Sequence, residues 1–418
     1  MRLAILGGLV ACQSAPVLDA KSSSEVTFHG DVQPITEAVC ARCHADASLA
    51  PFTLSTYADV SSRAELVLDS VESGAMPPFY AADGCDDYQD DFSLTEAEIQ
   101  VFRDWVAAGV PEGDSRDGPP LKASMGSNGL THVDYVLQLP EAYTPADQED
   151  DYRCFVLDWP DPSVVQTVAG FNVLPGDTAA VHHLIAYIVP PDLASEFDAM
   201  SGADGRAGYT CFGGPGGPVD HTDPDTALRW LAAWAPGTGG GMFPEGTGIP
   251  IEGGSRIVLQ IHYHPEVGNP QSDQSSVEIA MGQAFGDEWA MIQPFTNVEW
   301  LNTNLMEIPA HSEGVRHSYR MEMDQDFTVY SAGIHMHLQG RAANLTHETP
   351  DGESDCLLDV QNYDFNWQRQ FWFTEKKRVQ KGDTIALECS WDNPSDEALY
   401  WGEGTNDEMC LGTLYVTE

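Results

Sequence analysis

The sequence is short of basic residues. It holds 19 Lys and Arg against 65 Asp and Glu, so the formal net charge is −46. A surface this negative repels phosphate backbones, which argues against nucleic-acid binding. No stretch reaches the roughly 18 apolar residues that a membrane-spanning helix needs. The sequence also lacks a P-loop, a GxGxxG motif, a Ser-His-Asp signature and a repeat of solenoid length.

What remains is the composition of a folded, turn-rich protein. Hydrophobic residues make up 42% of the 418 residues, with 38 Gly and 27 Pro. This length corresponds to about two or three domains, each large enough to bury a core. The acidic surface suits a salty medium, and it is also able to attract metal cations or a basic redox partner.

The first twelve residues resemble an export signal. Met1 and Arg2 precede an apolar run from Leu3 to Ala11, and Cys12 follows it in a sequence similar to a bacterial lipoprotein cleavage box. We expect a signal and lipobox at 1–12, a linker at 13–27 and a periplasmic or cell-surface lipoprotein of a bacterium, with Cys12 as a possible membrane anchor. An ordinary signal remnant is the alternative.

Export turns most of the nine cysteines into disulfide candidates. Cys12 is set aside as the lipid site, and Cys40 and Cys43 belong to the motif described next. Six cysteines remain, enough for three bridges in any of several connectivities: Cys85, Cys154, Cys211, Cys356, Cys389 and Cys410.

Residues 40–44 read Cys-Ala-Arg-Cys-His, the CxxCH pattern of c-type heme attachment. The thiols of Cys40 and Cys43 add to the heme vinyl groups, and His44 ligates the iron. A thioredoxin-like pair would need a βαβ context, and a zinc site would need a second pair of ligands. The motif therefore predicts one covalently bound heme.

The residues around this motif predict a small all-α, cytochrome c-like domain at 28–114. Thr95 and Glu98 form a capping box that begins a closing helix, which Gly109 and Pro111 end. Met76 lies in a loop similar to those that present a thioether as second axial ligand, although a packing role is the alternative. The Gly- and Pro-rich stretch at 115–130 reads as a linker.

Three histidine clusters follow, and their spacing suits metal binding: His182-His183, His262-Tyr263-His264 and His335-Met336-His337. Residues 256–264 and 331–339 alternate as strands do, so each HxH presents two imidazoles on one face. Adjacent histidines point to opposite faces, so the HH pair needs a bend to serve one ion. A single cluster would read as ordinary histidines; three in one chain favour a zinc or copper site.

Four runs in this order resemble the copper type II monooxygenases, the family of the peptidylglycine α-hydroxylating and dopamine β-monooxygenases. These runs are Val181–Leu184, Leu259–His264, Ile334–Arg341 and Asp407–Cys410. The resemblance covers roughly 131–418. It implies two all-β sandwich domains of the jelly-roll type, at 131–290 and 291–418, each holding one copper ion.

The resemblance also assigns the ligands. It implies that His182, His183 and His262 bind an electron-relay copper, and that His335, His337 and Met409 bind the oxygen-activating copper. The residues alone would pair His262 with His264, which the family leaves outside the ligand set. A Met thioether suits Cu(I) and would be a poor zinc ligand. An ordinary core role is the alternative for Met409.

The family pattern also bears on the disulfides. It implies bridges between Cys154 and Cys211 and between Cys389 and Cys410. Cys85 and Cys356 match no family bridge, and a bond between them, joining the heme domain to the second sandwich, is a further hypothesis.

Departures from the family concern the substrate. The amidating enzymes hold a peptide carboxylate with an Arg two residues before the HxH, where this chain has Gly333. Their Asn and Tyr after the Met correspond to Leu411 and Thr413. Peptide amidation is therefore doubtful, and Leu411 suggests a more apolar substrate.

We expect, on this basis, an exported monooxygenase with two copper ions and one c-type heme. It would hydroxylate an activated C–H bond of a small molecule with O2, while the heme feeds electrons from ascorbate or a redox protein to the copper sites. The alternatives are a non-catalytic electron-transfer or copper-handling lipoprotein and a heme-copper reductase of small nitrogen oxides.

Overall fold

A computed structural model describes most of the chain: residues 26–45, 50–116, 129–161, 165–220, 226–235, 238–282, 289–301 and 303–418. The expected signal and lipobox at 1–12, with Cys12, and most of the linkers at 13–27 and 115–130 lie outside these residues. The described residues form two compact units. Unit 1 holds residues 26–77 and 92–116, and unit 2 holds residues 78–91 and 129–418.

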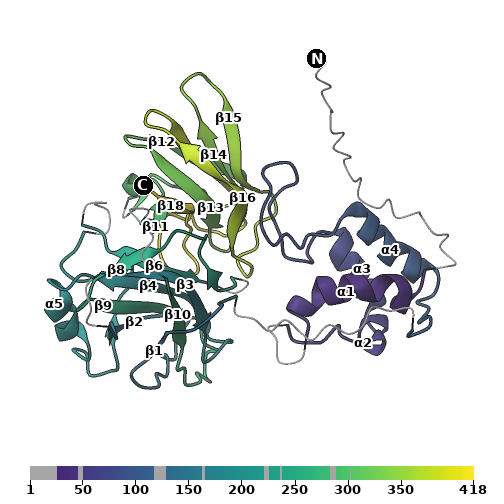
Figure 1. Ribbon diagram of the computed structural model, residues 1–418, viewed down its shortest axis with the longest axis horizontal. Coiled ribbons are helices and arrows are strands. Elements are labelled where there is room, and N and C mark those ends of the chain that lie inside the picture. Colours follow the sequence, from purple (N-terminus) through teal and green to yellow (C-terminus); the bar gives the residue numbers. More distant parts are fainter. Residues whose placement is uncertain are drawn as a thin grey trace, which may run out of the picture. The chain divides into compact units, whose positions relative to one another are not determined.

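Unit 1 is built from short helices (Figure 1). They are a π-helical turn at Phe28–Val32, α1 at Gln33–Ala38, a 3-10 turn at Cys40–Arg42, α2 at Tyr57–Ser61, α3 at Ala64–Glu72 and α4 at Glu96–Ala107. Their apolar faces meet in one core that includes Phe28, Val60, Phe102 and Trp105.

The predicted capping box at the start of α4 is confirmed. Thr95 Oγ1 accepts from the Glu98 N–H, and the Thr95 N–H donates to Glu98 Oε2 at 2.8 Å. After the helix, Gly109 adopts a φ of 84°, which ends it as predicted. Phe102 and Trp105 are the fully buried residues of this helix. Trp105 also donates its indole N–H to the Pro111 carbonyl, 3.0 Å away, and so holds the chain where it leaves α4.

Unit 2 consists mainly of strands, in agreement with the all-β prediction. The strands are β1 (Tyr135–Gln138), β2 (Asp151–Asp158), β3 (Gln166–Leu174), β4 (Val181–Val189), β5 (Tyr209–Thr210), β6 (Arg229–Trp234), β7 (Gly241–Met242), β8 (Ile249–Ile251), β9 (Arg256–Tyr263), β10 (Ser276–Gly282), β11 (Ala290–Phe295), β12 (Ser312–Glu322), β13 (Phe327–His335), β14 (Gly340–Glu348), β15 (Ser354–Val360), β16 (Gln370–Val379), β17 (Thr384–Asn393) and β18 (Leu411–Thr417). Helix α5 (Ala194–Met200) and a 3-10 turn (Val298–Trp300) accompany them.

The strands form three sheets (Figure 1). One has five strands, β1, β10, β3 and β7 in order with β8 also paired to β3, and another has the order β12-β17-β14-β15. The third has nine strands in the order β16-β13-β18-β11-β6-β4-β9-β2-β5. It therefore runs through both predicted sandwiches, which join where Ile292 of β11 pairs with Trp230 of β6. The three strands that carry histidine clusters, β4, β9 and β13, all lie in this sheet.

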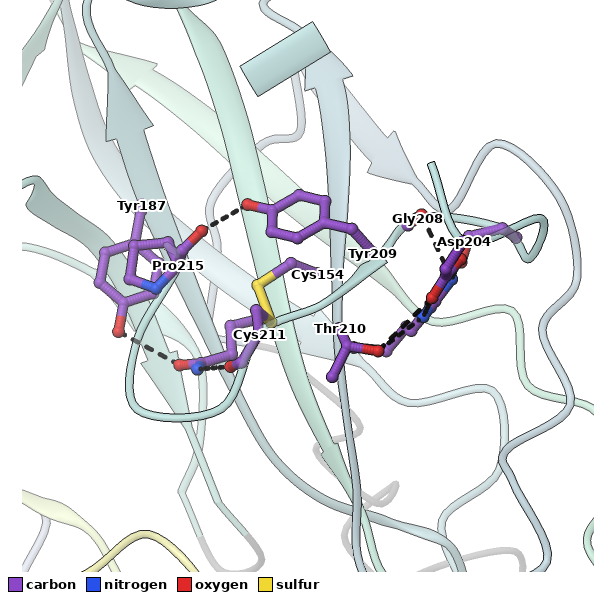
Figure 2. The surroundings of a disulfide bond; sticks show 11 residues. Cys154, Tyr187, Asp204, Gly208, Tyr209, Thr210, Cys211 and Pro215 are labelled. Carbon is purple, nitrogen blue, oxygen red and sulfur yellow. Dashed lines mark hydrogen bonds and ion pairs between the residues drawn. A yellow bond between two sulfur atoms is a disulfide. The ribbon is translucent and has the colours of Figure 1, made fainter. Parts of the chain in front are cut away.

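All three disulfides expected from the sequence are present: Cys154–Cys211, Cys389–Cys410 and Cys85–Cys356. Figure 2 shows the first of them. Beside it, Tyr209 donates its hydroxyl to the Pro215 carbonyl at 2.5 Å. Disulfides persist in oxidising compartments, so the three bridges indicate an exported protein. No helix of the described residues is long and apolar enough to cross a membrane.

The Cys85–Cys356 bridge lies inside unit 2, because residues 78–91 belong there although the sequence places them in the helical domain. The Ala82 N–H donates to the Asp359 carbonyl at 2.7 Å, and the Tyr88 hydroxyl donates to the Leu357 carbonyl at 2.9 Å. This segment thus adds main-chain pairing to the second sandwich.

Candidate metal centres

The first histidine group forms where β4 is irregular. The β4–β9 register pairs Val181 with Tyr263 and then His183 with His262, so a bulge leaves His182 without a partner. The bulge supplies the bend that the HH pair requires, since it re-aims a side chain out of strict alternation. Nδ1 of His182 lies 3.3 Å from Nδ1 of His183. The potential ligand atoms of His182, His183 and His262 all lie within 4.8 Å of one another.

The imidazoles of this group are neutral. Burial lowers the pKa of His182 to about 3 and the pKa of His183 well below its usual range, and the neighbouring His262 lowers both further. Nε2 of His182 is buried and has no hydrogen-bond partner among the described residues. A buried polar nitrogen without a partner is rare unless a metal or a water satisfies it. This donor set therefore fits a metal ion that takes neutral imidazole ligands.

His262 is held by a carboxylate. Its Nε2 lies 2.8 Å from Asp150 Oδ1, and its ring stacks on Tyr152 with centroids 4.1 Å apart. Its other nitrogen, Nδ1, lies 3.2 Å from the Tyr152 hydroxyl, and a metal bound at Nδ1 would replace that contact. His264 is exposed and contacts the same Asp150 oxygen at 3.3 Å, outside the ligand group. The pairing of His262 with His264 that the residues alone suggest is thus not formed, because β9 ends at Tyr263.

The second histidine group lies at the end of β13. His335 is the last residue of that strand and His337 follows it, with ring centroids 5.1 Å apart. Nδ1 of His335 lies 2.5 Å from Gln368 Oε1, and Nδ1 of His337 lies 3.1 Å from the Asp407 carbonyl oxygen. Because both acceptors require a proton on Nδ1, Nε2 of each ring is left for a metal. Burial lowers the pKa of both imidazoles, so they too are neutral.

Glu408 ties Met409 to this group. Its carboxylate accepts the backbone N–H groups of His337 at 3.0 Å and Gln339 at 2.6 Å, and the indole N–H of Trp391 at 2.9 Å. Met409 comes next in the chain and is 6% exposed. Cys410, bonded to Cys389, anchors the segment on its other side. The loop that carries the thioether is therefore fixed at both ends.

The two histidine groups adjoin each other. The rings of His183 and His335 have centroids 6.1 Å apart. Phe365 stacks on His182 at 4.3 Å and meets His337 at 5.7 Å. The five imidazoles thus form one continuous cluster of rings.

Residues 403–407 link the two sandwiches beside this cluster. The Tyr152 hydroxyl donates to the Glu403 carbonyl, Thr405 Oγ1 donates to Asp150 at 2.7 Å, and Asn406 Nδ2 donates to Glu149 at 2.9 Å. Sequence reasoning missed Asp150 and Gln368, which orient His262 and His335. Each lies far along the chain from the histidine it contacts, so no local spacing marks it.

We expect Glu403→Gln to raise the melting temperature of the metal-free protein by several degrees at about pH 8 and to leave it unchanged at about pH 4. Burial raises the pKa of the Glu403 carboxyl from 4.5 to about 7. Between these values the folded state binds more protons than the unfolded state, so stability falls as the pH rises from 4.5 to 7 and stays lower above. The amide removes this loss.

Calorimetry at both pH values checks this expectation. Glu397→Gln is the control, because the side chain of Glu397 is exposed. An equal rise at both pH values would contradict the titration of Glu403 as the cause.

The CxxCH motif of unit 1 forms a single turn. The N–H groups of Cys43 and His44 both donate to the Cys40 carbonyl, at 3.2 and 2.8 Å, and neither cysteine is in a disulfide. Nδ1 of His44 lies 3.0 Å from the Phe52 carbonyl oxygen, which leaves Nε2 for an iron. Met76 follows α3 and is partly buried. Two unbridged thiols beside an oriented imidazole fit covalent heme attachment.

Residues 299–417 match the family model described as the C-terminal domain of the copper type II ascorbate-dependent monooxygenases. The matched segment contains His335, His337 and Met409. These findings support the copper type II monooxygenase family. The first histidine group lies outside the matched segment, and curated relatives extend the similarity to it.

Two of these relatives illustrate the similarity to the copper type II monooxygenases. MOXD1 homolog 1 of Drosophila melanogaster is 25% identical over 279 residues, which cover 62% of this chain and 39% of that protein. Dopamine beta-hydroxylase of Bos taurus is 25% identical over 300 residues, which cover 67% of this chain and 46% of that protein. The chain thus spans less than half the length of these relatives.

Among solved structures, the chain is similar to PNGase F, a glycosylasparaginase from Flavobacterium meningosepticum. The TM-score is 0.33 and the sequence identity 8%, with 68% of this chain and 96% of that chain covered.

Proposed function

We propose that this chain is a copper-dependent monooxygenase that hydroxylates an activated C–H bond of a small molecule with O2. The observation that carries the proposal is the first histidine group, whose three ligand atoms lie within 4.8 Å of one another in a chain related to copper monooxygenases. His182, His183 and His262 would hold one copper ion. His335, His337 and Met409 would hold the other and serve as the catalytic centre.

The chemistry that the bound copper ions supply is electron storage and the reduction of O2. The protein orients the ligands: Asp150 holds His262, Gln368 holds His335, and the Asp407 carbonyl holds His337. Such outer partners fix the tautomer and direction of each ring. Burial of His337 and Met409 excludes water from the second group. A thioether beside two imidazoles favours Cu(I) over Zn, which supports copper here.

The proposal extends to unit 1 as an electron entry port. Cys40 and Cys43 would attach a c-type heme, with His44 and Met76 as axial ligands. The heme would deliver electrons from a redox protein or from ascorbate to the copper sites. Export, with Cys12 as the membrane anchor of a bacterial lipoprotein, would place the protein where heme c and disulfides form.

A non-catalytic copper-handling or electron-transfer lipoprotein is the second candidate. Gly333 favours it, because a residue without a side chain replaces the family's substrate-binding Arg. Oxygen consumption coupled to formation of a hydroxylated product separates the two functions.

Elemental analysis of protein exported in a host that attaches heme c, and then loaded with copper, tests the metal assignment. We expect about two copper and one iron per chain. His183→Ala should retain about one copper, because a three-ligand site would lose one of its imidazoles. His264→Ala is the matched control and should retain both. Zinc in place of copper, or full copper in His183→Ala, would contradict the assignment.

A further inference from the structure

A cavity of about 90 Å³ in unit 2 is lined by strands of both sandwiches. Four aromatic residues contribute to its wall: Phe171, Phe243, Trp372 and Tyr415. Phe243 stacks on Tyr415 with ring centroids 4.7 Å apart, and Trp372 packs against Tyr415 at 5.2 Å. These packed rings make most of the wall apolar.

The polar side chains of the wall are already paired. Thr413 Oγ1 donates to Gln370 Oε1 at 2.8 Å, and Gln370 Nε2 donates to Ser331 Oγ at 3.0 Å. Thr238 Oγ1 donates to the Gln368 carbonyl at 2.7 Å. None of the described residues that line the cavity is charged. A charged ligand group would therefore lose its hydration here without gaining a partner.

Gly239 and Gly241 also line the cavity. A Cβ at Gly239 or Gly241 would meet no atom within 4 Å, and neither residue has a positive φ. Neither the backbone conformation nor packing thus requires glycine at these positions. At Gly240, between them, a Cβ would come within 2.5 Å of the Phe171 carbonyl oxygen, so close approach requires glycine there.

The cavity lies on the same face of the nine-stranded sheet as His335. Gly333 of β13 pairs with Gln370 on one side and with Thr413 on the other. A Cβ at Gly333 would lie 2.5 Å from Gln370 Oε1 and 2.6 Å from Thr413 Oγ1. The side of β13 to which this Cβ would point therefore faces two residues that line the cavity. His335 is two residues further along β13, on the same face and about 7 Å away.

We propose that this cavity binds the uncharged, apolar part of the substrate and directs its reacting C–H bond toward His335. An enclosed apolar cavity of about 150 Å³ takes a whole benzene molecule. This smaller recess therefore takes part of an apolar ring or chain, and the rest of the ligand extends through its opening. That the bound molecule is a substrate rests on the proposed function. That the cavity binds an uncharged apolar molecule is independent of the proposed function.

Binding to the full, metal-free chain tests the inference, with toluene as the probe and saturation-transfer NMR as the measurement. Benzoate and benzylammonium carry the same ring with a charge. We expect toluene to bind at least about tenfold more tightly than either charged probe. Gly241→Leu fills the cavity and should weaken toluene binding at least about tenfold, with Gly241→Ala in between. Ala199→Leu, which adds the same side chain to an exposed position of α5, should bind toluene as the unchanged protein does.

Gly239→Leu provides a second variant that fills the same space, and circular dichroism checks that both variants fold. Equal toluene binding by folded Gly241→Leu and the unchanged protein, or tighter binding of a charged probe, would overturn the inference. Because the measurement needs no copper, that failure is distinct from failure of the proposed function. The latter would appear as normal toluene binding by a copper-loaded protein that consumes no O2.

Discussion

Met409→Leu abolishes nearly all O2 consumption by the copper-loaded protein while the fold is retained. This is the result that we expect, because leucine has a similar volume but offers no thioether lone pair. Exchanges between Leu and Met usually destabilise a core by less than about 1.5 kcal/mol. Loss of an outer partner of a metal ligand typically lowers affinity or activity about 10–100-fold, so loss of a ligand itself should exceed that range.

Met306→Leu is the matched control, since Met306 is fully buried in the same unit and belongs to no ligand group. Oxygen-electrode rates and melting temperatures of both variants are the measurements. The heme absorbance should be the same in both. Full oxygen consumption by Met409→Leu would show that Met409 is only a packing residue.

Replacement of both Cys40 and Cys43 by serine should remove all covalently bound heme. Serine hydroxyls do not add to the heme vinyl groups, so no thioether bond forms. The readout is heme absorbance that remains with the chain after denaturing electrophoresis. Copper content should stay at about two per chain, because the proposed copper ligands lie in unit 2.

Ala41→Ser is the matched control for this double variant. It introduces the same residue between the two cysteines and leaves the CxxCH pattern intact, so it should retain its heme. If the unchanged chain, exported in a host that attaches heme c, carries no covalent heme, the cytochrome assignment of unit 1 is wrong.

Sequence patterns predicted the features that local chemistry decides. The capping box of Thr95 and Glu98 forms because both partners lie within one helical turn. The requirement for a bend at His182-His183 follows from strand alternation, and the bulge in β4 provides it. The resemblance to the copper family supplied two disulfide pairs, and the third followed as the pair that was left.

Features set by distant parts of the chain were beyond this reasoning. Asp150 reaches His262 only because β2 pairs with β9, and Gln368 reaches His335 only because of the fold around β13 and β16. The alternating pattern of the sequence predicted a strand that continues to residue 339, whereas β13 ends at His335. The buried Glu408 carboxylate accepts the backbone N–H of His337 and so turns the chain away from the strand direction. No pattern in the neighbouring sequence indicates this contact.

Residues 78–91 also determine how the chain comes apart. They lie between the two pieces of unit 1 yet pair with the second sandwich, and Cys85 is bonded to Cys356. A protease that cuts once between residues 116 and 129 would therefore release no fragment until a reductant opens that bridge. Shortened versions of this protein that begin after residue 116 would leave Cys356 as an unpaired thiol and expose the edges that Ala82 and Tyr88 cover.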